Sequence, residues 1–211
     1  WDDCADLDYS NPALRKAMVE AMKYWVRTCD FDGFRCDMAG LVPAEFWREA
    51  RPALDSLKPL FMLAEWQDEP LHFKAFNANY GWKWKDVTKD IAAGKQTAHS
   101  LDTLLDYLHH FYPKGYYQMY FTQNHDENSW SGTETDLYGP AADAFNVLAF
   151  TWQGVPMIYN GQEDALSQRL AFFKKDPIRW KNFSKMPFFQ KLCALKHSNR
   201  SLDAGEKGGA V

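Results

Sequence analysis

Three acidic residues of this 211-residue chain have the placement that acid–base or nucleophilic chemistry requires. Asp37, Glu65 and Asp126 each stand at, or shortly after, the carboxyl end of a segment rich in apolar residues. Glycoside hydrolysis needs one ionised and one protonated carboxyl near neutral pH, both facing the bond that is broken. The placement of these acids therefore points to that kind of reaction.

The neighbours of the first two acids favour opposite protonation states. Arg35 and Asp37 are two residues apart and share one face of a strand, where the guanidinium favours the ionised carboxylate. Glu65 ends a strand of apolar residues and precedes Trp66, so loss of hydration raises its expected pKa. The simpler alternatives are a structural Arg–Asp pair and a solvated glutamate at a strand end.

His125 stands directly before Asp126 and offers hydrogen bonds to a neutral polyol. Metal ligation is the rival interpretation, but no second histidine stands at chelating spacing, and the four cysteines form no zinc-type pattern. The chain has no G-x-S-x-G, G-x-G-x-x-G or P-loop motif. With 24 basic and 28 acidic side chains, the net charge of −4 argues against a nucleic-acid partner. No apolar run reaches the ~18 residues that a membrane span needs.

The elements that must position these side chains alternate along the chain. Apolar periodicity predicts helices over 12–27, 43–57, 84–93, 101–112, 141–152 and 187–199. Short segments rich in apolar residues predict strands over 33–37, 60–64, 117–122 and 155–159, and the alternation of Phe76, Ala78 and Tyr80 predicts a strand over 74–80. Apolar strands separated by helices indicate parallel pairing and an α/β fold, in which active sites assemble at the carboxyl ends of the strands. The pattern alone fits an open doubly wound sheet or a piece of a closed barrel.

Four segments resemble, in order, the conserved segments of the α-amylase family of glycoside hydrolases. They are Gly33-Phe-Arg-Cys-Asp37, Ala64-Glu65-Trp66, Phe121-Thr-Gln-Asn-His-Asp126 and Gly154-Val-Pro-Met-Ile-Tyr-Asn-Gly-Gln-Glu163. The resemblance implies a partial (β/α)8 TIM barrel, strands four to eight with their helices, over residues 1–202. Residues 203–211 are then expected to begin the β-domain that usually follows the barrel.

The resemblance also implies a role for each site residue. Asp37 is expected to be the nucleophile and Glu65 the general acid and base of a double displacement with retention of configuration. Asp126 is expected to hold sugar hydroxyls and stabilise the oxocarbenium-like transition state, with Arg35 and His125 in support. The implied function is hydrolysis of α-1,4-glucosidic bonds in starch or maltooligosaccharides.

Aromatic residues near these segments are candidates for stacking on sugar rings, with ordinary packing as the alternative for each. The candidates are Trp66 and Tyr80, and beyond them Trp82, Trp84 and Trp130. The chain departs from the family where many members carry Lys-His after the nucleophile, because it has Gly40 and Leu41 there. Contacts to the leaving-group sugars must therefore come from other residues.

Two other functions stay open at this point. One is a same-family oligo-α-glucosidase, transglycosylase or isomerase, which would share the three acids. The other is a non-catalytic barrel homologue that acts as a binding or partner subunit, although such proteins usually lose an acid. No cofactor is implied. A structural calcium ion is not indicated, but it stays open because Asp6 matches a calcium-binding position of some members and not of others.

The resemblance accounts for five of the eight strands of a barrel, which typically has about 250 residues. Strands one to three would precede Trp1. We therefore expect residues 1–211 to be inactive alone, and to be completed by the missing N-terminal part of the barrel or by a self-association that covers the open sheet edges. The sequence fixes no localisation; the many exported bacterial relatives favour a periplasmic or secreted protein.

Overall fold

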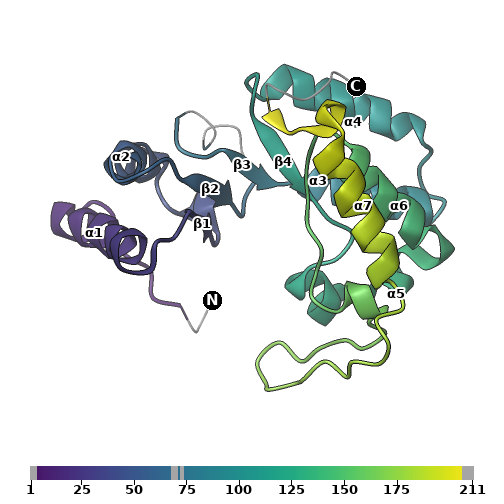
Figure 1. Cartoon of the computed structure of the whole chain (residues 1–211). Coiled ribbons are helices and arrows are strands. Elements are labelled where there is room, and N and C mark those ends of the chain that lie inside the picture. The colour runs from purple at the N-terminus through teal and green to yellow at the C-terminus, as the bar shows by residue number, and fades with distance from the viewer. Residues whose placement is uncertain (1–3, 68–70, 72–73, 206–211) are drawn as a thin grey trace. The chain divides into compact units, whose positions relative to one another are not determined.

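Helices alternate with parallel strands in two structural units, Trp1–Tyr80 and Gly81–Val211 (Figure 1). The computed structural model describes residues 4–67, 71 and 74–205. Of the segment 203–211, which was expected to begin a β-domain, only residues 203–205 are among the described residues. No helix among the described residues has the length and hydropathy to cross a membrane.

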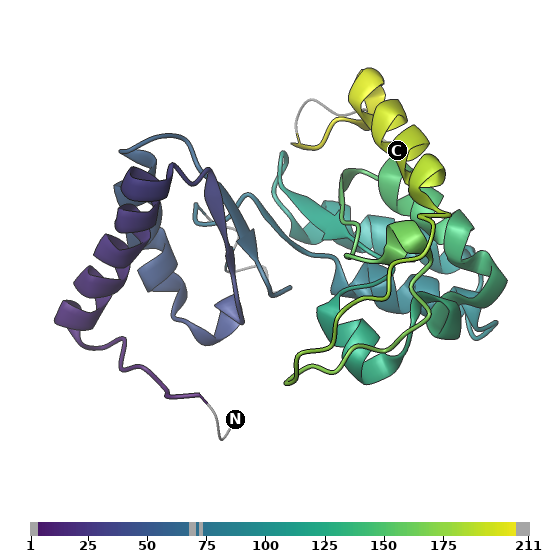
Figure 2. The same cartoon turned by 60° about the horizontal axis from the view of Figure 1, so that its bottom comes forward.

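The described residues of the first unit form three strands, two long helices and one short 3-10 helix. In chain order they are α1 (Pro12–Cys29), β1 (Gly33–Cys36), η1 (Ala39–Leu41), α2 (Ala44–Asp55), β2 (Phe61–Ala64) and β3 (Ala78–Tyr80). β2 pairs in parallel with β1 and with β3. Figures 1 and 2 show α1 and α2 next to each other on one side of these strands.

Local sequence signals fix the helices of this unit. The Asn11 side chain accepts a hydrogen bond from the Ala13 amide at 2.9 Å, and Pro12 occupies the first turn of α1. On α2, Arg51 donates to the Leu60 carbonyl at 3.0 Å and to the Asn77 side chain at 2.9 Å. These bonds tie α2 to the segments that enter β2 and β3.

Up to residue 205, the second unit forms two strands, five α-helices and four short 3-10 or π-helices. They are α3 (Trp82–Ala92), α4 (His99–Phe111), β4 (Tyr117–Tyr120), the π-helix η3 (Glu127–Ser131), α5 (Glu134–Tyr138), η4 (Gly139–Ala141), α6 (Ala142–Thr151), β5 (Gly154–Pro156), η5 (Gln162–Asp164), α7 (Met186–Ser198) and η6 (Arg200–Leu202). β4 and β5 pair in parallel. Figure 2 shows the segment between η5 and α7 as a long loop.

The core of the second unit joins α3, α4, β4 and α6. Its buried members are Trp84, Leu104, Leu108, Tyr120, Ala149 and Trp152. The rings of Trp84 and Tyr120 lie 5.3 Å apart between centroids. A smaller cluster of Phe150, Phe189 and Leu192 packs α7 onto α6. The first cluster packs helices onto β4, and the second packs one helix onto another, as expected for helices that cover a sheet in an α/β fold.

The strands predicted over 74–80 and 155–159 are shorter or shifted in the structure. β3 begins only at Ala78, because Lys74 has a left-handed backbone with φ of 65° and Asn77 uses its side chain to accept the Met62 amide. β5 ends at Pro156, and the Tyr159 amide donates to the Gln162 side chain at 2.6 Å. A turn therefore replaces the end of the predicted strand.

Candidate active site

Asp37 and Glu65 are held by one guanidinium group at the ends of neighbouring strands. In the parallel register of β1 and β2, Cys36 stands opposite Ala64, so the residues that follow meet at one edge. Arg35 Nη1 donates to Asp37 Oδ1, and Arg35 Nη2 lies 2.6 Å from Glu65 Oε1. The first unit thus brings together three of the residues that the sequence singled out.

The two carboxyl groups have different environments. The Asp37 side chain is 73% exposed, whereas the whole Glu65 residue is 6% exposed. Burial raises the pKa of Glu65; a hydrogen bond from the Met38 amide and the charge of Arg35 oppose the rise, and Asp37 adds to it. Glu65 is therefore the carboxyl that favours its protonated form.

The turn after β1 aims the backbone at Glu65. Met38 adopts a left-handed conformation with φ of 42° and ψ of 42°, and its amide donates to Glu65 Oε2 at 2.9 Å. This strained backbone immediately follows Asp37, as is common at functional sites. The turn therefore fixes one oxygen of the buried carboxyl.

Trp66 lies directly over Gly40 in the same turn. A Cβ atom at Gly40 would come within 2.0 Å of the indole ring, so no larger residue fits without displacement of the ring. This contact gives a physical reason why the chain has no lysine there. The indole takes the space that a longer side chain would need.

Tyr80, at the end of β3, contacts Arg35. Arg35 Nε donates to the Tyr80 hydroxyl at 3.1 Å, and the guanidinium carbon lies 5.5 Å from the ring centroid. Tyr80 is 4% exposed, and its stacking on a sugar stays a prediction. For Trp84 the stacking hypothesis is wrong, because this residue is fully buried in the core of the second unit.

Asp126 and His125 belong to the second unit, where they follow β4. His125 Nε2 lies 3.4 Å from Asp126 Oδ2, and both side chains are partly exposed. The Asn124 side chain accepts the Glu127 amide at 2.7 Å, at the start of η3. Burial and the charge of Asp126 raise the pKa of Tyr159, which follows β5. The segments after β4 and β5 therefore meet at Asp126.

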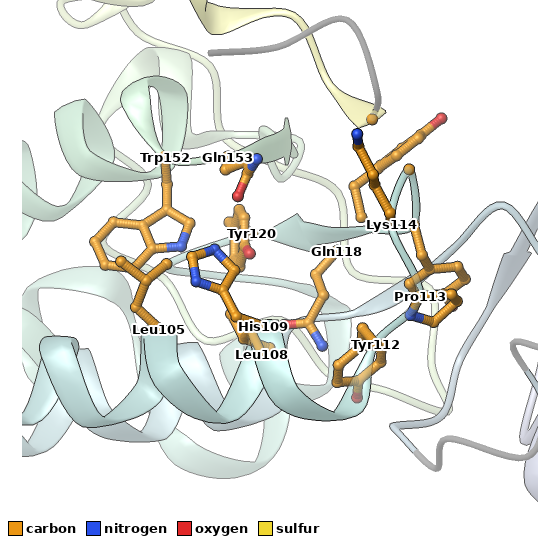
Figure 3. A pocket seen from close by; sticks show the side chains of 14 residues that line it. Leu105, Leu108, His109, Tyr112, Pro113, Lys114, Gln118, Tyr120, Trp152 and Gln153 are labelled. Atoms are coloured by element: carbon orange, nitrogen blue, oxygen red, sulfur yellow. The ribbon is translucent and has the colours of Figure 1, made fainter. Parts of the chain in front are cut away.

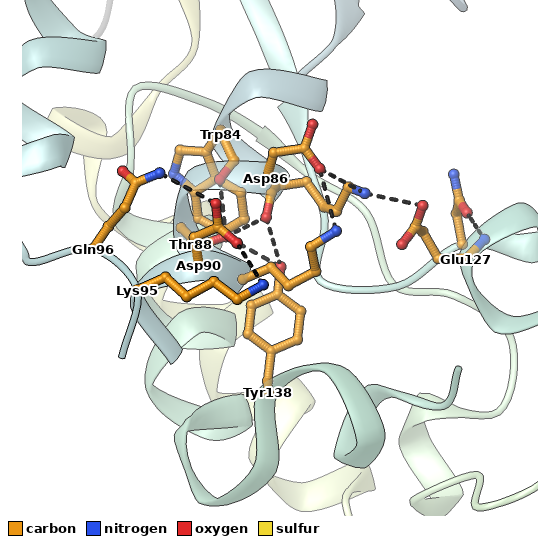
Figure 4. A network of polar contacts seen from close by, with 11 residues as sticks. Trp84, Asp86, Thr88, Asp90, Lys95, Gln96, Glu127 and Tyr138 are labelled. Carbon is orange, nitrogen blue, oxygen red and sulfur yellow. Dashed lines mark hydrogen bonds and ion pairs between the residues drawn. The ribbon is translucent and has the colours of Figure 1, made fainter. Parts of the chain in front are cut away.

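A buried ion pair anchors the residue after Asp126. Lys85 on α3 is 4% exposed and lies 2.9 Å from Glu127 Oε1 and 3.0 Å from Asp86 Oδ1. Figure 4 shows Glu127 and Asp86 in this network, with Thr88 and Tyr138 beside it. Sequence reasoning missed Lys85, because a lysine on a helix is normally a solvated residue.

Side-chain hydrogen bonds hold the segment after β5 in place. Gln162 Nε2 donates to Glu134 Oε1 at 2.7 Å and to Thr122 Oγ1 at 3.0 Å. Glu163 Oε2 accepts the Gly161 amide at 2.7 Å. These buried or half-buried bonds tie β5 to the segment that leads from β4 to Asp126.

A separate cavity of about 370 Å³ lies at the beginning of β4, whereas Asp126 follows the end of that strand (Figure 3). His109 and Tyr112 on α4 line it together with Trp152 and Gln118. None of the described residues that line it carries a carboxyl group, so the candidate chemistry lies elsewhere. Among the described residues no three His, Cys, Asp or Glu side chains are grouped to hold a metal ion, and a calcium role for Asp6 stays untested.

Parallel strands with acids at their carboxyl ends are the arrangement expected for part of a (β/α)8 barrel, where active sites lie at that edge of the sheet. The model of the alpha amylase catalytic domain matches residues 2–186, and the chain belongs to the α-amylase family of glycoside hydrolases. The predicted family and the predicted α/β fold, a partial barrel, are thereby confirmed.

Relatives and solved structures agree with this assignment. Alpha-amylase MalA of Haloarcula japonica is 26% identical over 97% of this chain and 30% of its own length. A cyclomaltodextrinase of Geobacillus thermopakistaniensis is 30% identical over 74% of this chain and 28% of its own. The maltogenic alpha-amylase AmyB of Thermotoga neapolitana matches with a TM-score of 0.82 and 34% identity, over 93% of this chain and 46% of that one. The chain thus spans between about a quarter and a half of the length of these proteins.

Proposed function

We propose that the protein that carries this chain is a retaining α-glucan hydrolase, which cleaves α-1,4-glucosidic bonds in starch or maltooligosaccharides. The observation that carries the proposal is the Arg35 guanidinium, shared between the exposed Asp37 carboxylate and the buried Glu65 carboxyl. The names of the relatives, alpha-amylase and cyclomaltodextrinase, support the substrate class.

In the first step, an Asp37 oxygen attacks the anomeric carbon while the bond from that carbon to the leaving oxygen breaks. Glu65 gives its proton to the leaving oxygen, and the raised pKa of Glu65 supports this role. In the second step, water attacks the same carbon, Glu65 takes up the water proton, and the bond to Asp37 breaks.

The shared guanidinium favours retention over inversion. Retaining enzymes hold their two carboxyl groups about 5–5.5 Å apart, whereas inverting enzymes need about 6.5–9.5 Å to admit a water molecule. Arg35 contacts both carboxyls through two nitrogens of one planar group, and Asp37 is near enough to raise the pKa of Glu65, which supports a short separation of the two carboxyls. We assign Asp126 and His125 to the hydrogen bonding of sugar hydroxyls.

The configuration of the first product tests this proposal. Maltoheptaose is incubated with the protein that contains the whole barrel, and the anomeric protons of the products are followed by NMR before mutarotation. The α-anomer is expected to appear first. Initial formation of the β-anomer would refute the double displacement.

Products from other sugars separate this function from its alternatives. Hydrolysis of maltoheptaose without turnover of sucrose or isomaltose supports an amylase. Transfer products, isomerised sucrose or glucose released from isomaltose would instead favour a transglycosylase, an isomerase or an oligo-α-glucosidase. Binding of maltoheptaose without any turnover would favour a non-catalytic homologue.

A further inference from the structure

Three large aromatic side chains form an exposed patch beside His125. Trp130 is 60% exposed, Phe172 43% and Phe173 74%. The Phe172 ring centroid lies 5.3 Å from that of Trp130 and 4.9 Å from that of Phe173. The same ring stacks on His125 at 6.0 Å with an interplanar angle of 25°. We call Trp130, Phe172 and Phe173 the aromatic platform.

Hydrogen bonds hold the two phenylalanines at the tip of a closed loop. Asp176 accepts the Gln168 side chain at 2.9 Å and the Ala171 amide at 3.0 Å. These bonds join the two ends of the loop 168–176 on either side of Phe172 and Phe173. The rings therefore stand on a shaped turn and not on a loosely attached segment.

The same loop is tied to the segment that follows Asp126. The buried Asn128 side chain donates to the Gln168 carbonyl at 3.1 Å and accepts the Leu170 amide at 2.8 Å. The Ser129 hydroxyl donates to the Leu170 carbonyl at 2.8 Å. Because Asn128 and Ser129 directly follow the Asp126 region, the platform has a fixed place beside that candidate site residue.

Water contact with three such rings is unfavourable, since further burial of their exposed aromatic surface would be stabilising. A core role does not account for them, because all three are exposed. The apolar face of a pyranose ring fits a flat aromatic side chain, and its hydroxyls stay at the rim for polar partners such as His125.

We propose that the aromatic platform binds glucosyl units of an α-glucan that extend beyond the sugar held at Asp126, and so makes the enzyme prefer longer chains. The inference rests on the proposed function and names the residues that set its chain-length preference. Continuity of the platform with His125 selects a glucan as the occupant over a protein partner.

The test compares a long and a short substrate in the protein that contains the whole barrel. Phe173→Ala and Trp130→Ala are each expected to lower the ratio of kcat/KM for maltoheptaose to that for maltotriose by about three- to ten-fold, through KM, as the loss of one stacking contact predicts. Trp130→Phe should keep most of the ratio. A platform variant with the wild-type ratio would overturn the proposal.

Trp180→Ala provides the matched control. Trp180 is 43% exposed in the same long loop but stacks on Phe183, at 5.2 Å, away from the platform. This variant should keep the wild-type ratio. If the platform variants change only the oligomeric state and leave the ratio intact, the patch is a protein interface and the proposal is wrong.

Binding to an inactive variant separates the two proposals. With Glu65→Gln, calorimetry should show maltoheptaose binding that weakens about three- to ten-fold when Phe173→Ala is added. If Phe173→Ala weakens the binding of maltoheptaose but the protein without substitutions hydrolyses no glucan, the proposed function is refuted and the aromatic platform remains a glucan-binding surface. Hydrolysis without platform dependence would refute the platform alone, and neither binding nor hydrolysis would refute both.

Discussion

Arg35 is the residue on which the geometry of both carboxyls of the first unit depends. Its two terminal nitrogens contact Asp37 and Glu65, and its Nε donates to Tyr80. A planar guanidinium can serve three partners at once, whereas an ammonium is a single point charge. The same group therefore orients Asp37 and limits the rise in the pKa of Glu65 that burial causes.

Arg35→Lys should lower kcat more than it raises KM. A hydrogen bond to a charged group contributes about 1.5–3 kcal/mol, so loss of one contact predicts a fall in kcat of about 10- to 100-fold. Steady-state kinetics on maltoheptaose measures the effect. Arg48→Lys is the control, because Arg48 pairs with Glu45 on the surface of α2. Full turnover by Arg35→Lys would contradict the shared role.

Asp37→Asn should reduce turnover by several orders of magnitude, because an amide cannot form the glycosyl ester. Asp32→Asn is a suitable comparison, since Asp32 is an exposed partner of Lys58 that lies before β1. Rates are measured on maltoheptaose with the protein that contains the whole barrel. Normal turnover by Asp37→Asn would disprove the nucleophile assignment.

Glu65→Gln should slow substrates with poor leaving groups far more than activated aryl glycosides. The wild-type kcat/KM should also fall at alkaline pH as Glu65 loses its proton, and this limb should vanish in the variant. An equal loss on both kinds of substrate would argue against the acid role.

Glu65 also makes stability depend on pH. Burial raises its pKa in the folded state, so its favourable contribution is complete below the unfolded pKa and is lost as pH rises through the folded one. Glu65→Gln should therefore raise the urea midpoint relative to wild type at pH 8 more than at pH 4. If the difference in urea midpoint between Glu65→Gln and wild type is the same at pH 4 and pH 8, ionisation of Glu65 does not destabilise the folded protein.

At the scale of elements, the turn between β1 and α2 positions the acid as much as the strands do. Met38 directs its amide at Glu65, and Gly40 leaves room for the Trp66 ring. The ring follows β2, so the turn and the end of β2 are packed as one feature. The shape of this turn depends on Gly40, because a residue with a Cβ would collide with the indole.

Gly40→Ala should destabilise the protein by about 1–3 kcal/mol, the usual result of overpacking, because the new methyl collides with the indole. Urea unfolding measures the loss. When Gly40→Ala is instead made in a protein that already carries Trp66→Ala, the further loss of stability should be much smaller, because the indole is no longer there. Additive effects of the two changes would mean that the contact has no energetic role.

At the scale of the whole molecule, β1 and β5 are each paired with one neighbour among the described residues. An unpaired strand edge tends to recruit another strand. The relatives are about two to three times as long as the chain, and a complete barrel has eight strands. We therefore propose that further strands complete this sheet in the whole protein.

Residues 1–211 alone should show no hydrolysis of maltoheptaose and should form oligomers or aggregates in solution. Reducing-sugar assays and size-exclusion chromatography measure the two outcomes, with the protein that contains the whole barrel as reference. A monomer that hydrolyses maltoheptaose at the rate of that reference would contradict the prediction.

Much of this arrangement was predictable from sequence because it is local. Asn11 and Pro12 fix the start of α1, and the apolar run before Glu65 fixes β2. Burial of Lys85 was not predictable, because it requires Glu127 from another part of the chain. The packing of Trp66 on Gly40 and the loop that carries Phe172 likewise depend on contacts between distant segments. Such contacts leave no periodic pattern in the sequence.

Cys36 stands between Arg35 and Asp37 in the sequence and faces the opposite side of β1, where it is 7% exposed. Burial raises the pKa of its thiol to about 12. Alkylating agents and peroxides react with the thiolate, so this sulfur stays inert at physiological pH. Such reagents meet the exposed Cys4 and Cys29 first. A spectroscopic label can therefore be attached at these two positions while β1 remains chemically untouched.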